Sequence, residues 1–400
     1  MDKTVLTNIA LPRPTGTEGN EKVNGYIENR FADMGLQALS LPFSCAVWEE
    51  GEAILKAGSR TFEAFVNPFS LPFEGVCEVV SASTLSEIEG KDLSGKILLL
   101  FGPIASEQIQ PKDYPFYYPD EHKALIEALE AARPRAIIAA TGKSDSCGAD
   151  PFPLFADGAF DIPGVYVSEN NLSGLLEAFK NSKAELKIIS ARKPAEARQI
   201  IARREGEKGR GKIVICAHMD SQYSTPGALD NAAGVCVMLC GAQKLFCEQQ
   251  SFENLHTIEF VPFNGEESYG AWGELCYAEY CGGDGEAITA VINIDSPCHL
   301  SSKTAAACMN FTDEQLKAID ELISKHPDVE EGELWYSGDH AAYAFSGIPC
   351  IALSSSDLFE GGLENTHTLR DTPDDVDEKL IESAGEFTAR LTMLLDRLMP

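Results

Sequence analysis

The sequence predicts an α/β protein in which helices sandwich a mainly parallel, mixed sheet and a smaller, β-rich α/β domain is inserted. Strand-like and helix-like segments alternate from residue 212 to the end, which is typical of βα units around a parallel sheet. Residues 42–193 instead show short strand-like runs punctuated by Gly, Pro and Ser. Because 400 residues exceed one ordinary core, we expect a main domain of residues 1–41 and 195–400 and an inserted domain of residues 42–194.

The first expected element is an amphipathic helix over residues 21–34, in which apolar side chains recur at helical spacing. Gly35 ends this helix, and a short strand follows at residues 36–41. The inserted domain should contain strands at residues 53–55, 61–66, 78–81, 95–102, 136–141 and 162–168 and a helix at residues 122–132. These segments predict a core of its own for the insertion, whose default role is structural support or control of access.

Residues 199–202 predict a further short strand, and residues 205–211 an exposed turn in which basic and acidic side chains are interleaved. Beyond this turn, strands are expected at residues 213–217, 258–263, 287–297 and 347–353, and helices at residues 235–246, 268–280, 313–325 and 378–398. The strand at residues 213–217 consists of β-branched or small residues without alternation. This pattern indicates a central strand that is covered on both faces.

The composition excludes several classes of partner. A formal net charge of -30 at pH 7 repels phosphate backbones and anionic lipids, so we expect neither nucleic-acid nor membrane partners. The N-terminus has no extended apolar stretch typical of a signal peptide, and no apolar run is long enough to span a membrane. The 12 cysteines are scattered without a CxxC pair, which indicates reduced thiols and a cytoplasmic protein.

Side chains that bind metal ions occur near the ends of these strands and in the loops of the main domain. The set comprises His218, Asp230, Glu266, Glu267, Asp295 and His367. In an open α/β sheet, sites form at the carboxyl ends of the strands. Histidine and carboxylate ligands with one shared carboxylate are expected of a co-catalytic zinc pair, whose ions lie about 3.5–4 Å apart. The ordinary alternative is a hydrogen-bonded His-x-Asp pair and an aspartate that caps a helix.

The motifs around these residues resemble those of the zinc-dependent M28 peptidases, which include aminopeptidases and the glutamate carboxypeptidase group. The matching segments are HMDS (218–221), GALDNAAG (227–234), NGEESYG (264–270), NIDSP (293–297), SGDHAAYAFSGIPC (337–350) and THTLRDTPDDVD (366–377). They follow the order of the family and span its catalytic core. The opening stretch resembles the first helix of the family, and the inserted segment resembles a protease-associated (PA) domain.

The resemblance implies a metallopeptidase with two zinc ions per chain. In the family pattern, Asp230 bridges both ions, because it occupies the position of the shared carboxylate. His218 and Asp295 then complete one site, and Glu267 and His367 complete the other. The implied substrate is a peptide.

The same resemblance assigns roles to residues around the metals. Glu266 becomes the general base, and Asp220 is expected to hydrogen-bond the imidazole of the metal ligand His218. Asp339 and His340, in the Asp-His position of the family, are expected to support the site.

The sequence departs from the family pattern at two positions. Leu229 stands where many members carry a second aspartate, but the ligand is the following residue, so the site is retained. Thr366 stands where many members carry a tyrosine that hydrogen-bonds the tetrahedral intermediate. Tyr336 or Tyr343 is therefore a candidate replacement. His256, His299 and His326 match no motif and are expected to be ordinary loop or helix residues.

Aminopeptidase activity is the expected function, and other functions remain open. A carboxypeptidase or dipeptidase of the glutamate carboxypeptidase type would require an arginine for the terminal carboxylate, and Arg370 is the only arginine close to a ligand in sequence. A non-catalytic peptide-binding protein on the same scaffold is less favoured, because every ligand position is filled by a suitable residue. Glutaminyl-cyclase-like transfer is disfavoured by the large insertion and by the paired Glu266 and Glu267.

Overall fold

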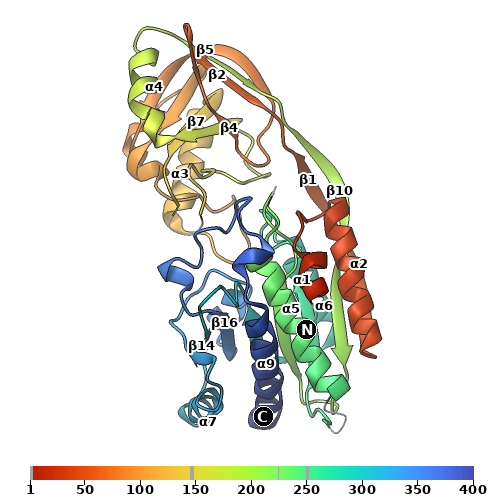
Figure 1. The fold of residues 1–400 in the computed structure, drawn as a ribbon. Coiled ribbons are helices and arrows are strands. Elements are labelled where there is room, and N and C mark those ends of the chain that lie inside the picture. The colour runs from red at the N-terminus through yellow and green to blue at the C-terminus, as the bar shows by residue number, and fades with distance from the viewer. Residues whose placement is uncertain (1–2, 145–147, 224, 249–251) are drawn as a thin grey trace. The chain divides into compact units, whose positions relative to one another are not determined.

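The computed structural model describes residues 3–144, 148–223, 225–248 and 252–400. The chain divides into two compact units (Figure 1). Unit 1 comprises Met1–Cys45 and Glu196–Pro400, and unit 2 comprises Ala46–Ala195. The boundaries lie within two long strands, β1 (Gln37–Glu49) and β10 (Ala191–Arg204).

Unit 1 is built on a mixed sheet with the strand order β1-β10-β12-β11-β13-β16-β14-β15. Its centre consists of the parallel strands β12 (Thr257–Phe263), β11 (Lys212–His218), β13 (Ile288–Ile294) and β16 (Cys350–Ser355). β10 pairs antiparallel with β12, and β14 (Thr304–Met309) pairs antiparallel with β16 and parallel with β15 (Val329–Glu331). The predicted α/β class with a mainly parallel, mixed sheet is therefore confirmed.

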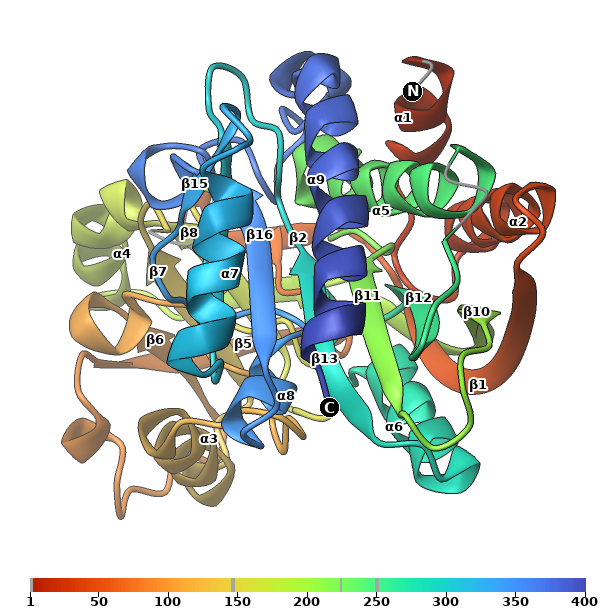
Figure 2. The same ribbon diagram turned by 90° about the horizontal axis from the view of Figure 1, so that it is seen from below.

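Helices cover both faces of this sheet. One face packs against α1 (Lys3–Ile9), α2 (Glu18–Asp33), α5 (Ala233–Gln243), α7 (Asp313–Ile323) and α9 (Glu378–Leu398). The other face packs against α6 (Trp272–Asp284) and α8 (Ala341–Phe345). Figure 2 views the sheet from the side on which α7 and α9 lie. Every residue of β11 is buried, because alternate side chains enter the two opposite cores, as the lack of alternation predicts.

Unit 2 has a mixed sheet of its own, in the order β3-β2-β9-β5-β6-β7-β8-β4. The parallel strands are β5 (Phe73–Ala82), β6 (Lys96–Leu100), β7 (Ala136–Thr141) and β8 (Gly164–Ser168). The antiparallel strands are β2 (Ala53–Ala57), β3 (Arg60–Phe62), β4 (Phe65–Val66) and β9 (Ala184–Ile188). Its helices are α3 (Asp120–Ala132) and α4 (Leu172–Phe179). Apolar residues of α3, β6 and β7 form a separate core.

Two expected strands are much longer than the sequence pattern indicates. The strand expected at residues 36–41 is part of β1, and the strand expected at residues 199–202 is part of β10. Pro42 lies within β1, where a proline normally signals a strand end. It is tolerated because β1 forms the edge of the sheet, where a missing N–H removes no ladder bond on the outer side.

Candidate metal centre

Three adjacent parallel strands of the unit 1 sheet carry predicted site residues at or just after their carboxyl ends. His218 is the last residue of β11, Asp295 directly follows β13, and the pair Glu266 and Glu267 follows β12. β11 lies between β12 and β13, and all three run in the same direction. Their carboxyl ends therefore meet, as expected for a site in an open α/β sheet.

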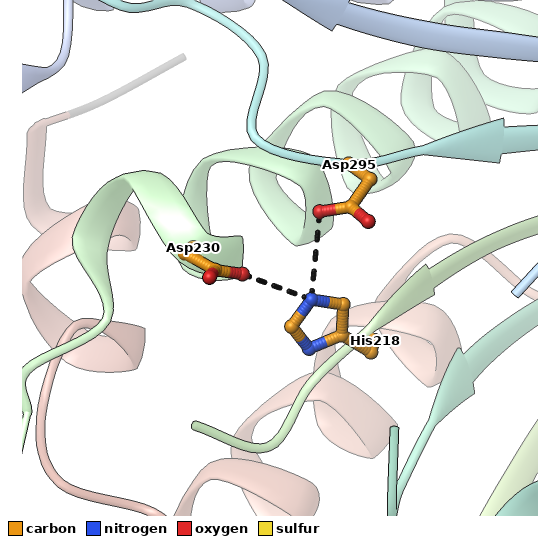
Figure 3. Close-up of side chains that lie close together, drawn as sticks. All are labelled: His218, Asp230 and Asp295. Atoms are coloured by element: carbon orange, nitrogen blue, oxygen red, sulfur yellow. Dashed lines mark ion pairs between the residues drawn. The ribbon is translucent and has the colours of Figure 1, made fainter. Parts of the chain in front are cut away.

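His218 faces two carboxylates (Figure 3). Its Nε2 atom is 3.1 Å from Oδ1 of Asp230, which lies in a turn with non-helical backbone angles directly before α5, and 3.5 Å from Oδ1 of Asp295. His218 is buried. Burial by itself lowers the pKa of the imidazole, but the neighbouring carboxylates outweigh it and raise that pKa well above its ordinary value.

His367, in the loop before α9, faces the other oxygen of Asp230. Its Nε2 atom is 3.1 Å from Oδ2 of Asp230 and 3.1 Å from Oε1 of Glu267. Within the described residues, Oε1 of Glu267 is buried and has no hydrogen-bond partner. Burial disfavours the charge on Asp230, yet the two histidines lower the pKa of its carboxyl group well below the usual range.

The described residues thus contain two sets of side chains that can hold a metal ion. One set is His218, Asp230 and Asp295, and the other is Asp230, Glu267 and His367, with the ligand atoms of each set within 4.8 Å of one another. Asp230 belongs to both sets. The five ligands inferred from the sequence motifs therefore lie together, with Asp230 in the shared position.

Asp371 fixes the backbone at Asp230. Its carboxylate accepts hydrogen bonds from the N–H groups of Leu229 (2.6 Å) and Asp230 (3.1 Å). Burial raises the pKa of Asp371 to about 7, although these two donors favour the ionised form. One carboxylate therefore sets the direction in which the residue shared by both sets points.

Asn231 connects this turn to the end of β13. Its Nδ2 donates to the carbonyl oxygen of Ile294 (2.8 Å), and its Oδ1 accepts from the N–H of Ser296 (3.2 Å). These two backbone groups flank Asp295. An added Cβ at Gly234 would lie 2.1 Å from Oδ1 of Asn231 and 2.6 Å from the carbonyl oxygen of Ile294, so a larger residue would break this connection.

Arg13 stabilises the loop that follows β11. Its guanidinium donates to the carbonyl oxygens of Met219 (2.5 Å), Pro226 (2.6 Å) and Gly227 (2.9 Å). Its backbone N–H donates to Oγ of Ser221 (3.1 Å). Burial lowers the pKa of Arg13 to about 10, so the guanidinium stays charged at neutral pH. A buried cation is thus paired with backbone dipoles of the ligand-bearing loop.

Asp220 does not form the expected hydrogen bond to His218. The distance between Oδ1 of Asp220 and Nδ1 of His218 is 3.8 Å, which is too long for a hydrogen bond. Oδ2 of Asp220 instead accepts from the hydroxyl of Thr15 (3.2 Å) and from the N–H of Glu267 (3.2 Å). Asp220 therefore positions Glu267 and acts on the imidazole only over a longer distance.

Glu266 lies beside the ligands but belongs to neither set. Burial raises the pKa of its carboxyl group well above the ordinary value, and the nearby carboxylates of Glu267 and Asp339 add to this effect. A carboxylate with a raised pKa is a stronger base, which is the property a general base requires.

His340 is buried and makes structural hydrogen bonds. Its Nε2 is 2.9 Å from the carbonyl oxygen of Trp335, so this nitrogen carries the proton, and its Nδ1 accepts from Nδ2 of Asn293 (3.1 Å). Burial lowers the pKa of His340 and keeps the ring neutral. The adjacent Asp339 has a carboxyl group whose pKa burial raises to about 8. These contacts hold Asp339 near the acidic residues of the site.

The hydroxyl of Thr366 donates to the carbonyl oxygen of Leu363 (3.0 Å) and thus stabilises its own loop. The two tyrosines considered as replacements for the family tyrosine make apolar contacts. The ring of Tyr336 stacks on Phe345 with centroids 5.2 Å apart. Tyr343 packs against the core on the face of the sheet that α6 and α8 cover.

The three histidines outside the motifs make local contacts. His256 is buried 3.2 Å from Oδ1 of Asp396, and His299 lies 2.7 Å from Oδ2 of Asp357. Nδ1 of His326 is 2.8 Å from a carbonyl oxygen of its own helix end. None of the three belongs to a set of metal-ligand type within the described residues.

The fold is that of the α/β zinc exopeptidases. Residues 199–392 match the family model described as Peptidase family M28. The resemblance seen in the sequence motifs is thereby confirmed.

Solved structures share this fold along both units. An aminopeptidase from Aneurinibacillus sp. strain AM-1 has a TM-score of 0.74 and 18% sequence identity, over 98% of this chain and 92% of that chain. BSAP, a zinc aminopeptidase from Bacillus subtilis, has a TM-score of 0.69 and 18% identity, over 99% of this chain and 94% of that chain. At such identities the likeness shows the fold.

Among curated proteins, the chain is 24% identical over 277 residues to the probable lipoprotein aminopeptidase LpqL of Mycobacterium tuberculosis. The match covers 67% of this chain and 51% of that protein, so the chain spans about half the length of this relative. Among the helices in the described residues, none combines the length and apolar character needed to cross a membrane.

We predict that Asp371→Asn loosens the turn that carries Asp230. An amide side chain keeps only one acceptor and turns its NH₂ group toward a backbone N–H, so one hydrogen bond is lost at a cost of about 1–3 kcal/mol. Hydrogen exchange measured by mass spectrometry should show faster exchange of the peptide that contains Leu229 and Asp230. Asp374→Asn, an exposed change nearby, is the control. Equal exchange in both variants would contradict the role of Asp371.

Proposed function

We propose that this chain is a zinc-dependent aminopeptidase with two zinc ions as cofactors. The observation that carries the proposal is the position of Asp230, whose two carboxylate oxygens face two different histidines, each beside a further carboxylate. The match to the M28 family model supports hydrolysis of peptide bonds, and the acidic site supports a substrate with a free amine.

The chemistry of the donors fits zinc. A tetrahedral zinc ion with ligand distances of about 2.0–2.1 Å places its ligand atoms about 3.3–3.4 Å apart. The corresponding distances here are 3.1 and 3.5 Å around His218 and 3.1 Å in both contacts of His367. A single imidazole N–H cannot serve two carboxylate oxygens well, whereas a cation between them satisfies all three atoms. Oε1 of Glu267, buried without a donor in the described residues, supports the same view.

In this proposal, His218 and Asp295 would hold one ion, Glu267 and His367 would hold the other, and Asp230 would contribute a ligand to both. A bound zinc ion would supply Lewis acidity toward the scissile carbonyl and toward the attacking water. Glu266, which lies beside the ligands but belongs to neither set, takes the proton from the attacking water. Glu266 then donates the proton to the leaving amine, so it ends the cycle ionised as it began.

The contacts of Arg370 favour action at the N-terminus of a peptide. Its Nε donates to Oδ1 of Asn365 (2.9 Å), and its Nη2 donates to the carbonyl oxygen of Glu364 (3.1 Å). The guanidinium is thus engaged with its own loop, which weakens the case for it as a receptor of a substrate carboxylate. A site rich in carboxylates attracts a protonated α-amine instead.

For unit 2 we propose a PA-like domain that contributes to substrate access. A cytoplasmic location remains part of the proposal, and it rests on the cysteines, since those in the described residues are free and mostly buried or half-buried.

The metal assignment predicts how much zinc each of three variants loses. Asp230→Ala should release both ions, because it removes the shared ligand, whereas His218→Ala and His367→Ala should each release one. Mass spectrometry of the purified proteins should give about two zinc equivalents for the wild type. Full zinc content in Asp230→Ala would contradict the bridging role, and the single histidine variants keep the test informative if that variant does not fold.

The base assignment predicts that Glu266→Gln keeps its zinc and lowers turnover by about 10²–10⁴-fold, because the amide cannot accept a proton. Zinc content and kcat are measured on the same preparation. The matched control is Glu267→Gln, which should lose metal as well as activity. Unchanged kcat in Glu266→Gln would exclude Glu266 as the base.

The substrate assignment predicts cleavage of leucine p-nitroanilide and no cleavage once its amine is acetylated. An N-acylated dipeptide with a free carboxylate is assayed in parallel. Activity on the acylated dipeptide alone would replace the aminopeptidase proposal with carboxypeptidase or dipeptidase action.

A further inference from the structure

The two oxygens of the Glu267 carboxylate have different surroundings. Oε1 faces His367 at 3.1 Å. Oε2 accepts a hydrogen bond of 2.9 Å from Nε2 of Gln222, and the same nitrogen is 3.4 Å from the backbone carbonyl oxygen of Glu267. Gln222 therefore contacts the residue at two points and leaves only Oε1 directed at the second set of ligands.

The chemistry fixes the orientation of the Gln222 amide. A carboxylate oxygen and a carbonyl oxygen both only accept hydrogen bonds, so the NH₂ end of the amide must face Glu267. The donor is neutral, so it holds the carboxylate without cancelling its charge. An acidic side chain here would repel Glu267, and a basic one would neutralise a ligand.

Hydrogen bonds hold the backbone of Gln222 and the nearby Thr225 in place. The carbonyl oxygen of Gln222 accepts from Oγ of Ser221 (3.2 Å) and from the N–H of Thr225 (3.4 Å). Oγ1 of Thr225 donates to the carbonyl oxygen of Thr368 (2.8 Å), the residue after His367. The loop is thus tied to the segment that bears the other ligand of the same set.

The other set lacks this arrangement at Asp295. There the hydroxyl of Ser296 donates to Oδ1 (3.3 Å), which is also the oxygen that faces His218. At Glu267 the hydrogen bond falls on the oxygen that faces away. The two sets therefore differ in how their terminal carboxylate is held.

We infer that Gln222 is a positioning residue that makes Glu267 a ligand through one oxygen and thereby sets the zinc affinity of the Asp230, Glu267 and His367 set alone. This inference rests on the proposed function. Loss of a side chain that orients a metal ligand typically costs about 10–100-fold in metal affinity. Gln222 directly follows the HMDS motif (218–221), and the sequence pattern gives it no role.

The experiment isolates each set before Gln222 is changed. His218→Ala leaves the set that contains Glu267, and His367→Ala leaves the set that contains Asp295. Gln222→Met, which keeps the size of the side chain but removes the donor, is added to each background. Zinc dissociation constants are then measured on metal-free protein by competition with a chromophoric chelator. Gln37→Met, an exposed change at the start of β1, is the matched control.

We expect Gln222→Met to weaken zinc binding about 10–100-fold in the His218→Ala background and to leave the His367→Ala background unchanged. Gln222→Glu, which replaces the NH₂ donor by an acceptor, should weaken the same background at neutral pH and serves if the methionine variant does not fold. Unchanged affinity in the His218→Ala background, or equal weakening in both backgrounds, would overturn the role of Gln222 alone. A wild-type protein that binds no zinc would overturn the proposed function and this inference with it.

Discussion

Asp230 must present one carboxylate oxygen to His218 and the other to His367, and both sets of ligands depend on this orientation. The side chain alone cannot ensure it, because a free aspartate rotates about two bonds. The surrounding structure restricts it at the backbone: Asp371 accepts from the N–H of Asp230, and Asn231 ties the same turn to β13. Arg13 supports the preceding loop through carbonyl oxygens. Preorganisation of this kind keeps a metal ligand in place before the metal arrives.

The charges around the strand ends also depend on the surrounding structure. Several carboxylates share a buried region, and burial raises the pKa values of Glu266 and Asp339 because charged forms lose solvation there. At Asp371, two backbone N–H groups and the guanidinium of Arg13 offset part of the same cost. Bound cations would offset much more, so metal binding and the stability of this edge of the sheet are expected to be coupled.

The side chains that form the two sets could be predicted because each leaves a local mark in the sequence. An apolar run that ends at His218, and an acidic pair separated by two residues from the end of another such run, place these side chains near strand ends without knowledge of the fold. Arg13, Asp371 and Gln222 leave no such mark, because they act through hydrogen bonds to backbone or to residues far away in sequence. The length of β1 was missed for a related reason: its proline is compatible with a strand only at a sheet edge, which is a property of the assembled sheet.

β1 and β10 are neighbours in the sheet order, and the boundaries of unit 2 fall within them. The chain therefore leaves unit 1 along one strand and re-enters along its partner, as it would through an ordinary hairpin. An excursion of this kind leaves the register of β11, β12 and β13 unaltered, since none of them pairs with β1 and β12 pairs with β10 only at residues 202–204, after the boundary at Glu196. The segment between the two strands could therefore be exchanged or removed as a unit without a change at the strand ends that carry the proposed ligands.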